Sequence, residues 1–365
     1  MSISKIAVIG SGTMGTGISI ASAANGVNVA MVDVSDEQLE RSRGAAESFF
    51  KRQVDKGRLE AADADAALGR ITRGTDLGAA GDAGLVIEAV FELLELKHEM
   101  YAKLMPIVDK DVIVASNTSA LKIADLAKAI DEPSRFLGLH YFSPAEINPI
   151  VEVVRGEQTA QAVMDACSAF LEATKKTPIP CKDQNGFAIN RFFCPFTNEA
   201  VRAMEDGLGT PAQIDRVSRL AVGAAAGPFR VMNLVKPRIN MNALRNLEPL
   251  GPFYAPADAL VALGEAEGLW EMGEDQSDES AEAVIVDRLR GATFLPVLEL
   301  LDEEVATAAD VDTGASLALK FGTPPCALMD QLGKDEVARL VGPMAERYGA
   351  PLPQSLARVG TLVSG

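Results

Sequence analysis

Apolar and polar positions alternate along the first part of the chain in blocks that predict strands and helices in turn. The apolar runs KIAVIG (5–10) and NVAMVD (28–33) predict strands, and the small residues between them predict a helix packed close to a sheet. Residues 36–69 are rich in charge and alanine, with widely spaced apolar positions, and predict a helical hairpin broken near Gly57. Such alternation is typical of α/β domains with a mostly parallel sheet.

The same alternation continues to about residue 155. Residues 91–108 carry apolar side chains at intervals of three and four, which predicts a helix, and His98 on it is predicted to be a solvated surface residue. Further strands are predicted at RITRGT (70–75), GLVIEAV (84–90), DVIVAS (111–116), RFLGL (135–139) and INPIVEVV (147–154).

Beyond about residue 184 the pattern becomes helical, and the chain repeats itself at an offset of 97 residues without a gap. A diluted match of this kind is what a duplicated helical unit leaves behind, although alanine-rich helices produce part of it by chance. Asn190 aligns with Asp287, so the two copies differ there. The matched residues are Arg191, Thr210, Ala212, Asp215, Leu220, Ala221, Pro228 and Met232 with Arg288, Thr307, Ala309, Asp312, Leu317, Ala318, Pro325 and Met329.

The glycines after the first predicted strand have the G-x-G-x-x-G spacing. Gly10, Gly12 and Gly15 would allow a tight turn, close approach of a pyrophosphate and close contact between helix and strand. The helix that follows offers unpaired amides to the phosphates. Asp33 ends the second strand, where an acid binds ribose hydroxyls and repels a 2′-phosphate, so NAD is favoured over NADP. The alternative is a glycine-rich turn in another kind of α/β protein.

These observations predict an α/β fold: a Rossmann-type doubly wound, mostly parallel sheet with an inserted helical hairpin, followed by a duplicated all-α C-terminal region. We expect an NAD-binding domain at 1–184 and helical domains at 185–283 and 284–365.

Composition narrows the classes of partner. A net charge of −17 argues against nucleic acid or an anionic membrane as a partner. No run of about 18 residues lacks polar side chains, so a soluble cytoplasmic protein is expected. The four cysteines share no metal or redox spacing, and no metal site is expected. Residues 246–287 hold eleven acids and no lysine or arginine, which predicts a solvated connector with a mobile GEDQSDES loop.

Candidate chemistry gathers where the predicted strands end. His140 follows a strand at the edge of the sheet that binds ligands, and a tight return through Pro144 to Pro149 would bring Glu152 against its ring. Such a pair suits a base that takes the hydroxyl proton of a secondary alcohol. The alternative is a core histidine with an accidental acid nearby. Ser116 to Ser119 end another strand at the same edge, where turn and N-cap chemistry is the plain alternative.

Five strings, GSGTMGTGIS, VIEAVFE, SNTSAL, GLHYFSPAEINPIVEVV and NGFAINR, resemble those of the NAD-dependent L-3-hydroxyacyl-CoA dehydrogenases, in order, across about residues 5–235. The tandem helical units resemble the dehydrogenase part of multifunctional fatty-acid oxidation proteins. The resemblance implies His140 as catalytic base, Glu152 as its orienting partner, and Ser119 and Asn190 as groups that hold the substrate oxygen. Cofactor contacts are expected from Gly10, Gly12, Met14, Gly15, Asp33, Val90, Phe91, Glu92, Lys97, Asn117 and Ser143.

Three departures from the family pattern bear on these expectations. Ser143 replaces a residue that is commonly asparagine, VMNLVKPRINMN lacks the usual aspartate, and the segment from Gly251 is at best a faint version of a glycine- and lysine-bearing one. We expect a homodimeric dehydrogenase that oxidises an L-3-hydroxyacyl-CoA reversibly in fatty-acid oxidation. The alternatives are a dehydrogenase of a free hydroxy acid or carnitine-like alcohol, and an NAD-binding relative without turnover.

Overall fold

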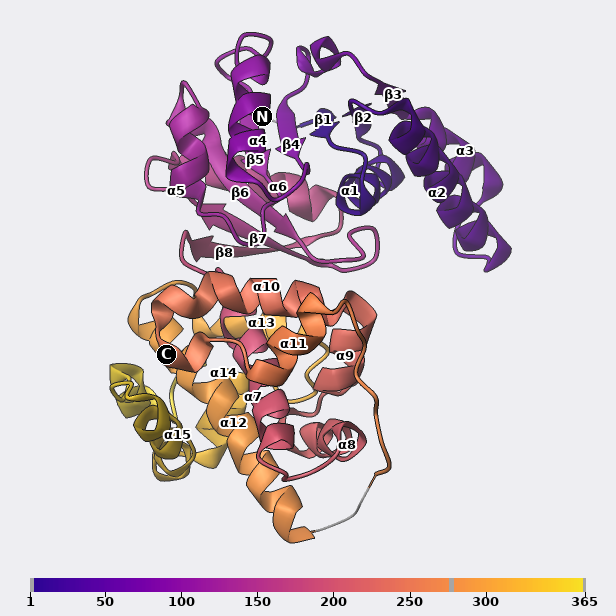
Figure 1. Ribbon diagram of the computed structural model, residues 1–365. Coiled ribbons are helices and arrows are strands. Elements are labelled where there is room, and N and C mark those ends of the chain that lie inside the picture. Colours follow the sequence, from indigo (N-terminus) through magenta and orange to yellow (C-terminus); the bar gives the residue numbers. More distant parts are fainter. Residues whose placement is uncertain (1–2, 276–278, 364–365) are drawn as a thin grey trace. The chain divides into compact units, whose positions relative to one another are not determined.

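The computed structural model describes residues 3–275 and 279–363, and the chain divides into two compact units, Met1–Asp183 and Gln184–Gly365. The first unit is built on a sheet and the second consists of helices (Figure 1). The α/β fold followed by a helical region is therefore confirmed. The predicted subdivision of the helical region at residue 283 stays a prediction.

An eight-stranded sheet in the order β3-β2-β1-β4-β5-β6-β7-β8 forms the centre of the first unit. Neighbouring strands are parallel except for β6 and β7, which are antiparallel. The strand order reverses between β1 and β4, and open sheets of this kind bind ligands outside the carboxyl ends of the strands at that point. The strands are β1 Lys5–Ile9, β2 Asn28–Val32, β3 Ile71–Gly74, β4 Leu85–Glu88, β5 Ile113–Ser116, β6 Phe136–Tyr141, β7 Ile150–Arg155 and β8 Thr177–Lys182.

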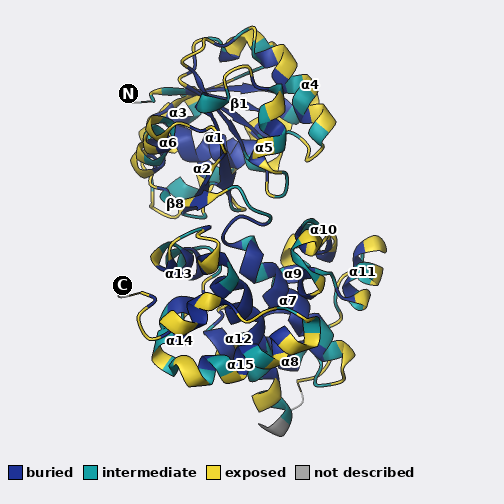
Figure 2. Ribbon diagram, turned by 90° about the vertical axis from the view of Figure 1, so that its left-hand side faces the viewer, coloured by how far each residue is buried: buried dark blue, intermediate teal, exposed yellow. Residues whose placement is uncertain are grey.

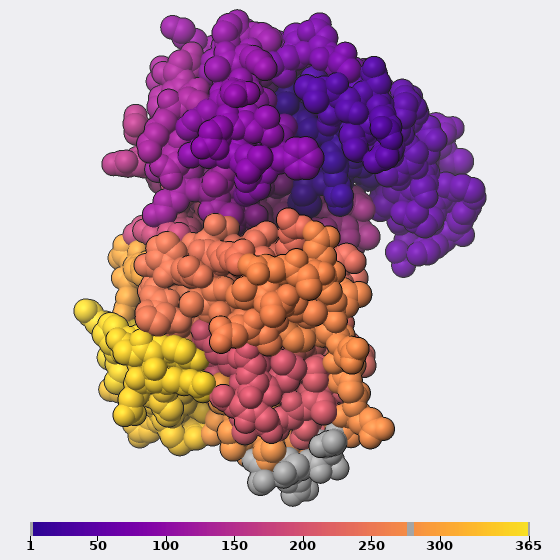
Figure 3. Space-filling view, viewed as in Figure 1, coloured from indigo at the N-terminus to yellow at the C-terminus, as the bar shows by residue number. Residues whose placement is uncertain are grey.

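Helices cover both faces of this sheet (Figure 2), and its strands are almost completely buried except for the two edge strands β3 and β8. The predicted hairpin is present as α2 and α3, with Gly57 at φ +64° between them. The hairpin has its own small apolar core around Phe50, and it forms a lobe that projects from the rest of the unit (Figure 3). The helices are α1 Thr13–Ala24, α2 Asp36–Asp55, α3 Ala61–Gly69, α4 Leu94–Leu104, α5 Ile123–Leu126 and α6 Gln161–Ala173, with 3-10 turns at Leu77–Ala80, Ala127–Ala129 and Pro133–Arg135.

The end of β6 and the burial of His98 are among the details of this unit that differ from the sequence prediction. Strand β6 runs on through His140 to Tyr141, because β7 continues to pair with it beyond Leu139. His98 is half-buried, and its Nε2 lies 2.9 Å from the backbone oxygen of Asp125, so the prediction of a solvated surface histidine was wrong.

Nine α-helices are described in the second unit, and α7 and α12 form its buried centre (Figure 2). Within the described residues of the whole chain, no helix is long and apolar enough to cross a membrane. The helices are α7 Asn190–Glu205, α8 Pro211–Val222, α9 Pro228–Val235, α10 Pro237–Leu247, α11 Asp258–Glu265, α12 Glu279–Asp302, α13 Ala308–Leu317, α14 Pro325–Leu332 and α15 Lys334–Tyr348, with 3-10 turns at Glu248–Leu250, Pro252–Tyr254 and Gln354–Arg358.

The duplication is visible in how the helices begin. Asp215 accepts hydrogen bonds from the backbone N–H groups of the residues that open α9, at 2.8 and 3.1 Å. Asp312, 97 residues later, does the same at the start of α14, at 2.7 and 2.8 Å. Thr210 and Thr307 cap α8 and α13 in the same manner. The repeat in the sequence is therefore a repeat in structure.

The two copies contact each other reciprocally. Arg191 in the first copy pairs with Glu303 in the second, and Arg288 in the second pairs with Asp206 in the first. The offset of 97 residues converts one pair into the other. Contacts that exchange in this way are those of an isologous, two-fold interface.

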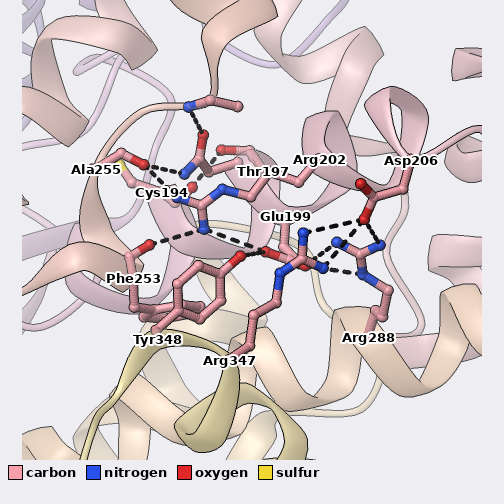
Figure 4. A network of polar contacts seen from close by, with 12 residues as sticks. Cys194, Thr197, Glu199, Arg202, Asp206, Phe253, Ala255, Arg288, Arg347 and Tyr348 are labelled. Atoms are coloured by element: carbon pink, nitrogen blue, oxygen red, sulfur yellow. Dashed lines mark hydrogen bonds and ion pairs between the residues drawn. The ribbon is translucent and has the colours of Figure 1, made fainter.

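A network of charged groups on α7, α12 and α15 extends this interface (Figure 4). Glu199 is completely buried, and it accepts from Arg288 Nε at 2.9 Å and from the Tyr348 hydroxyl at 3.1 Å. Arg202 lies over the Tyr348 ring and bonds the backbone oxygens of Phe253 and Ala255. The second copy thus supplies Arg288 and Tyr348 as partners of the buried Glu199, which also pairs with Arg202 of the first copy at 3.4 Å.

The acidic connector is solvent-exposed over much of its length, as predicted, but it also contains helical turns and ion pairs that the sequence did not indicate. Residues 248–265 form two 3-10 turns and helix α11, and acids of the segment pair with arginines of the first copy. Arg216, for example, bonds both Asp275 and Glu282. Residues 276–278 of the GEDQSDES loop lie outside the described residues.

Candidate active site

The predicted pair of His140 and Glu152 is formed by the antiparallel strands β6 and β7, whose register sets the two residues directly opposite each other. His140 Nδ1 lies 2.6 Å from Glu152 Oε2. Glu152 is fully buried and His140 is 6% exposed. With Nδ1 donating to the carboxylate, a neutral imidazole presents its lone pair at Nε2, which is the nitrogen that could accept a proton from a substrate.

Phe142 and Tyr141, which follow His140, contact its ring and the turn after β5, respectively. The Phe142 ring lies with its centroid 4.5 Å from that of the imidazole. The Tyr141 amide donates to Asn117 Oδ1 at 2.9 Å, which connects the end of β6 to the turn after β5. Asn117, predicted to contact the cofactor, therefore has a structural bond through its side-chain oxygen. Ser143 is exposed in the loop between β6 and β7.

The glycine loop between β1 and α1 has the features that a pyrophosphate requires. Gly10 has φ +104°, and a Cβ on Gly15 would lie 1.9 Å from the Gly10 oxygen, so both positions require glycine. A Cβ on Gly12 would meet nothing within 4 Å, which leaves open space over the loop. No side chain caps the N-terminus of α1 and its first turn holds no acid, so its amides can bind an anion. Met14 is half-buried in the same turn.

Asp33 follows β2 and holds the glycine loop from the side. Its Oδ2 accepts from the Ser11 amide at 2.7 Å and the Ser11 hydroxyl at 2.8 Å, and its Oδ1 accepts from the Ser35 amide at 3.0 Å. A carboxylate at this place is the group that would bind ribose hydroxyls and repel a 2′-phosphate. The residues of this edge thus fit NAD.

The turns after β4 and β5 are joined by a second set of predicted residues. Glu92 accepts from the Thr118 hydroxyl at 2.6 Å and from the Ser119 amide at 2.8 Å. Lys97 is buried on α4, and its Nζ lies 3.1 Å from Glu92 Oε2. Phe91, beside Val90 in the turn after β4, is 80% exposed.

The carboxyl-terminal edge of the sheet therefore brings together all the predicted site residues but one. Asn190 opens α7 and belongs to the helical unit. Sequence reasoning missed Glu88, which ends β4 and binds Lys97, and Lys176, which holds the loop between β6 and β7. The available signal for Glu88 was a carboxylate that directly ends an otherwise apolar strand, LVIE.

Comparison with known proteins agrees with this geometry. Residues 5–184 match the model of the 3-hydroxyacyl-CoA dehydrogenase NAD binding domain. The model of the 3-hydroxyacyl-CoA dehydrogenase C-terminal domain matches twice, at residues 186–270 and 284–362, as the duplication predicts.

Similar proteins carry related descriptions. The chain is 30% identical over 351 residues to the 3-hydroxyadipyl-CoA dehydrogenase of Escherichia coli, covering 92% of this chain and 73% of that one. It is 36% identical over 231 residues to a probable 3-hydroxybutyryl-CoA dehydrogenase of Deinococcus radiodurans, covering 63% and 83%. The crystal structure of 3-hydroxybutyryl-CoA dehydrogenase from E. coli superposes over both whole chains with a TM-score of 0.90 at 24% identity, which shows the same fold. The chain belongs to the NAD-dependent 3-hydroxyacyl-CoA dehydrogenase family.

Proposed function

We propose that this chain catalyses the reversible oxidation of an L-3-hydroxyacyl-CoA to the 3-oxoacyl-CoA. The observation that carries the proposal is the buried His140–Glu152 pair at 2.6 Å on the same sheet edge as the glycine loop. Relatives described as acting on 3-hydroxybutyryl-CoA and 3-hydroxyadipyl-CoA support a CoA thioester as substrate.

In this mechanism His140 Nε2 takes the proton of the substrate's 3-hydroxyl group. Glu152 holds the Nδ1–H tautomer and stabilises the imidazolium that forms. Ser119 and Asn190 donate hydrogen bonds to the oxygen as it becomes a carbonyl. The glycine loop and Asp33 would hold NAD, which would supply the acceptor for the hydride. In the reverse direction the His140 imidazolium returns its Nε2 proton to the oxygen.

Loss of NADH absorbance in the presence of acetoacetyl-CoA tests this proposal directly. We expect turnover by the wild-type protein and a loss of about 10² or more in kcat for His140→Gln. Turnover of a free hydroxy acid without CoA thioester activity would favour the first alternative predicted from the sequence. NADH binding without turnover of either substrate would identify a non-catalytic relative.

The setting of the reaction is also proposed. We place the protein in the cytoplasm and in fatty-acid oxidation, supported by its bacterial relatives. The homodimer predicted from the sequence stays a prediction. The reciprocal contacts between the two helical copies favour a monomer instead, because one chain already forms an interface of the type that homodimers use. Light scattering on the purified chain separates the two states.

A further inference from the structure

Glu88 is a fully buried carboxylate at the carboxyl end of β4 to which the proposed mechanism gives no role. Its Oε1 accepts from Lys97 Nζ at 2.6 Å and from the Val90 amide at 2.8 Å. Its Oε2 accepts from the Ser116 hydroxyl at 2.6 Å and the Tyr101 hydroxyl at 3.0 Å. Four donors on one buried carboxylate leave it little freedom to move.

This carboxylate joins two turns that follow neighbouring strands. Ser116 ends β5, and its hydroxyl also accepts from the Thr118 amide at 3.2 Å. On the other side of the carboxylate, Val90 begins the turn after β4. Glu88 therefore bonds Ser116 at the end of β5 and Val90 in the turn after β4. The turns that follow both strands carry predicted site residues.

A chain of charged groups also connects Glu88 to the turn after β5. Lys97 bridges Glu88 and Glu92, at 2.6 and 3.1 Å. Glu92 then accepts from the Ser119 amide at 2.8 Å and from the Ala120 amide at 3.1 Å. The route from Glu88 to Ser119 is thus continuous, through one ammonium group and one further carboxylate.

The ionisation of the neighbouring groups agrees with this arrangement. Burial and the Glu88 charge raise the pKa of Tyr101 well above its ordinary value, so its hydroxyl remains a donor. Burial acts to raise the pKa of Glu92, but the Lys97 charge and the bonds from Thr118 and Ser119 outweigh it and lower the pKa. Lys97 therefore lies between two carboxylates, and its position depends on both.

We propose that Glu88 is a positioning residue for the reaction: it fixes Lys97 and Ser116, and through Lys97 and Glu92 it holds the turn that presents Ser119 to the substrate oxygen. The inference rests on the role of Ser119 in the proposed function. It adds a residue that contacts neither of the expected ligands and acts through others.

A double-mutant cycle tests the proposal with Glu88→Gln, Ser119→Ala and the combined variant, measured as kcat/KM for acetoacetyl-CoA at saturating NADH. We expect Glu88→Gln to lose about tenfold to a hundredfold, and the combined variant to be close to Ser119→Ala alone, because residues acting as one unit are not additive. A merely structural role would lower activity by the same factor in both backgrounds.

Each outcome decides a different point. Full activity of Glu88→Gln beside an impaired Ser119→Ala, or losses that multiply, would overturn the role of Glu88 and leave that of Ser119 intact. Full activity of Ser119→Ala would overturn the Ser119 assignment, and the Glu88 proposal with it.

Two further variants serve as a fallback and as a control for this experiment. If Glu88→Gln does not fold, Ser116→Ala removes a single donor from the same carboxylate, and we expect a loss of about threefold to tenfold that disappears in the Ser119→Ala background. The matched control is Asp131→Asn, which removes a carboxylate paired with Arg135 at 2.9 Å before β6, at the opposite edge of the sheet. It should leave kcat/KM unchanged.

Discussion

At the scale of single residues, the proposed role of the Glu152 carboxylate as the partner of His140 leads to a prediction about catalysis. Glu152→Gln keeps the size of the side chain but removes its charge, so we expect kcat to fall by about 10² or more while NADH binding stays nearly unchanged. Combining it with His140→Gln should cost much less than the product of the single losses. Stopped-flow kinetics and NADH fluorescence titration measure both quantities.

The matched control for this prediction is Glu157→Gln, an exposed carboxylate just beyond β7, which should behave as wild type. If Glu152→Gln turned over at the wild-type rate, Glu152 would be a structural acid and His140 would need another partner.

At the same scale, we predict that Asp33 sets the preference for NAD over NADP. Its charge facing a 2′-phosphate should cost about 1 to 3 kcal/mol, which gives NADH roughly a tenfold to hundredfold advantage over NADPH in kcat/KM. Asp33→Asn should reduce that advantage. Ser11→Ala removes the hydroxyl bond to Asp33 Oδ2 but keeps the backbone amide bond and the charge, so discrimination should survive. Equal rates with both cofactors in the wild type would contradict the prediction.

At the scale of elements, the strands and helices up to Arg155 were largely predictable, because each has a clear apolar period and a glycine or polar turn at its end. Strand β8 was not predicted. Its sequence, TPIPCK, contains Pro178 and Pro180, which argue against a strand unless it lies at the edge of a sheet, as β8 does. The edge position depends on the whole fold and is not visible locally.

The candidate site could be predicted where its residues lie close together in the sequence. The prediction failed where residues far apart in the sequence converge. His140 and Glu152 could be paired because one tight return connects them. Glu88 could not, since its partners Lys97, Tyr101 and Ser116 lie 9, 13 and 28 residues further along the chain. Each partner alone has an ordinary explanation.

The loop between β6 and β7 is the element on which a pH prediction can be made. Lys176, buried before β8, donates to the backbone oxygens of Ala145 at 2.6 Å and Asn148 at 2.8 Å. Burial lowers the pKa of Lys176 to about 8, against an opposite effect of Glu146. Between this pKa and the ordinary value of 10.5, the unfolded chain binds more protons, so the stability of the fold should increase as pH rises through 8.

Urea unfolding of wild type and Lys176→Met at pH 7 and 9.5 measures this effect. Relative to Lys176→Met, the unfolding free energy of the wild type should increase by on the order of 1 kcal/mol between pH 7 and pH 9.5. Solvent screening of the ammonium keeps this gain small. Lys175→Met, an exposed neighbour, is the control and should show no such shift. A difference that stays constant with pH would mean that burial does not perturb Lys176.

At the scale of the whole molecule, the second helical copy should be required for the first to fold. Truncation after Ala283 would remove Glu303 from the buried Arg191. It would also remove Arg288 and Tyr348 from the buried Glu199, which would keep Arg202 (Figure 4). Leaving a buried charge without its partner costs about 3 to 5 kcal/mol, a large part of a domain's stability. We expect fragment 1–283 to be insoluble or to melt far below the full chain.

Soluble yield and thermal unfolding check this expectation, and Glu303→Gln in the full chain gives a milder version of the same loss. A soluble fragment 1–283 with full activity would show that the second copy is dispensable.

The isolated bridge between Ala224 and Phe321 shows what joining two copies in one chain makes possible. The offset of 97 residues relates these two positions to each other, and the bonds beside them, Ala225 to Lys320 and Gly322 to Gly223, exchange under it. In a symmetric homodimer a residue on the axis meets its own copy, so the gene can place there only two small side chains or two large ones.

Here Ala224 lies opposite Phe321 in the bridge, so a small residue pairs with a large one. The Phe321 ring packs against Phe193 and Phe196 of the first copy. The same freedom separates Asn190 from Asp287, which bonds Arg339 instead. Because each half is encoded separately, a substitution that improves packing or abandons substrate binding in one copy is not imposed on the other. Gene fusion thus allows the two sides of one interface to evolve independently.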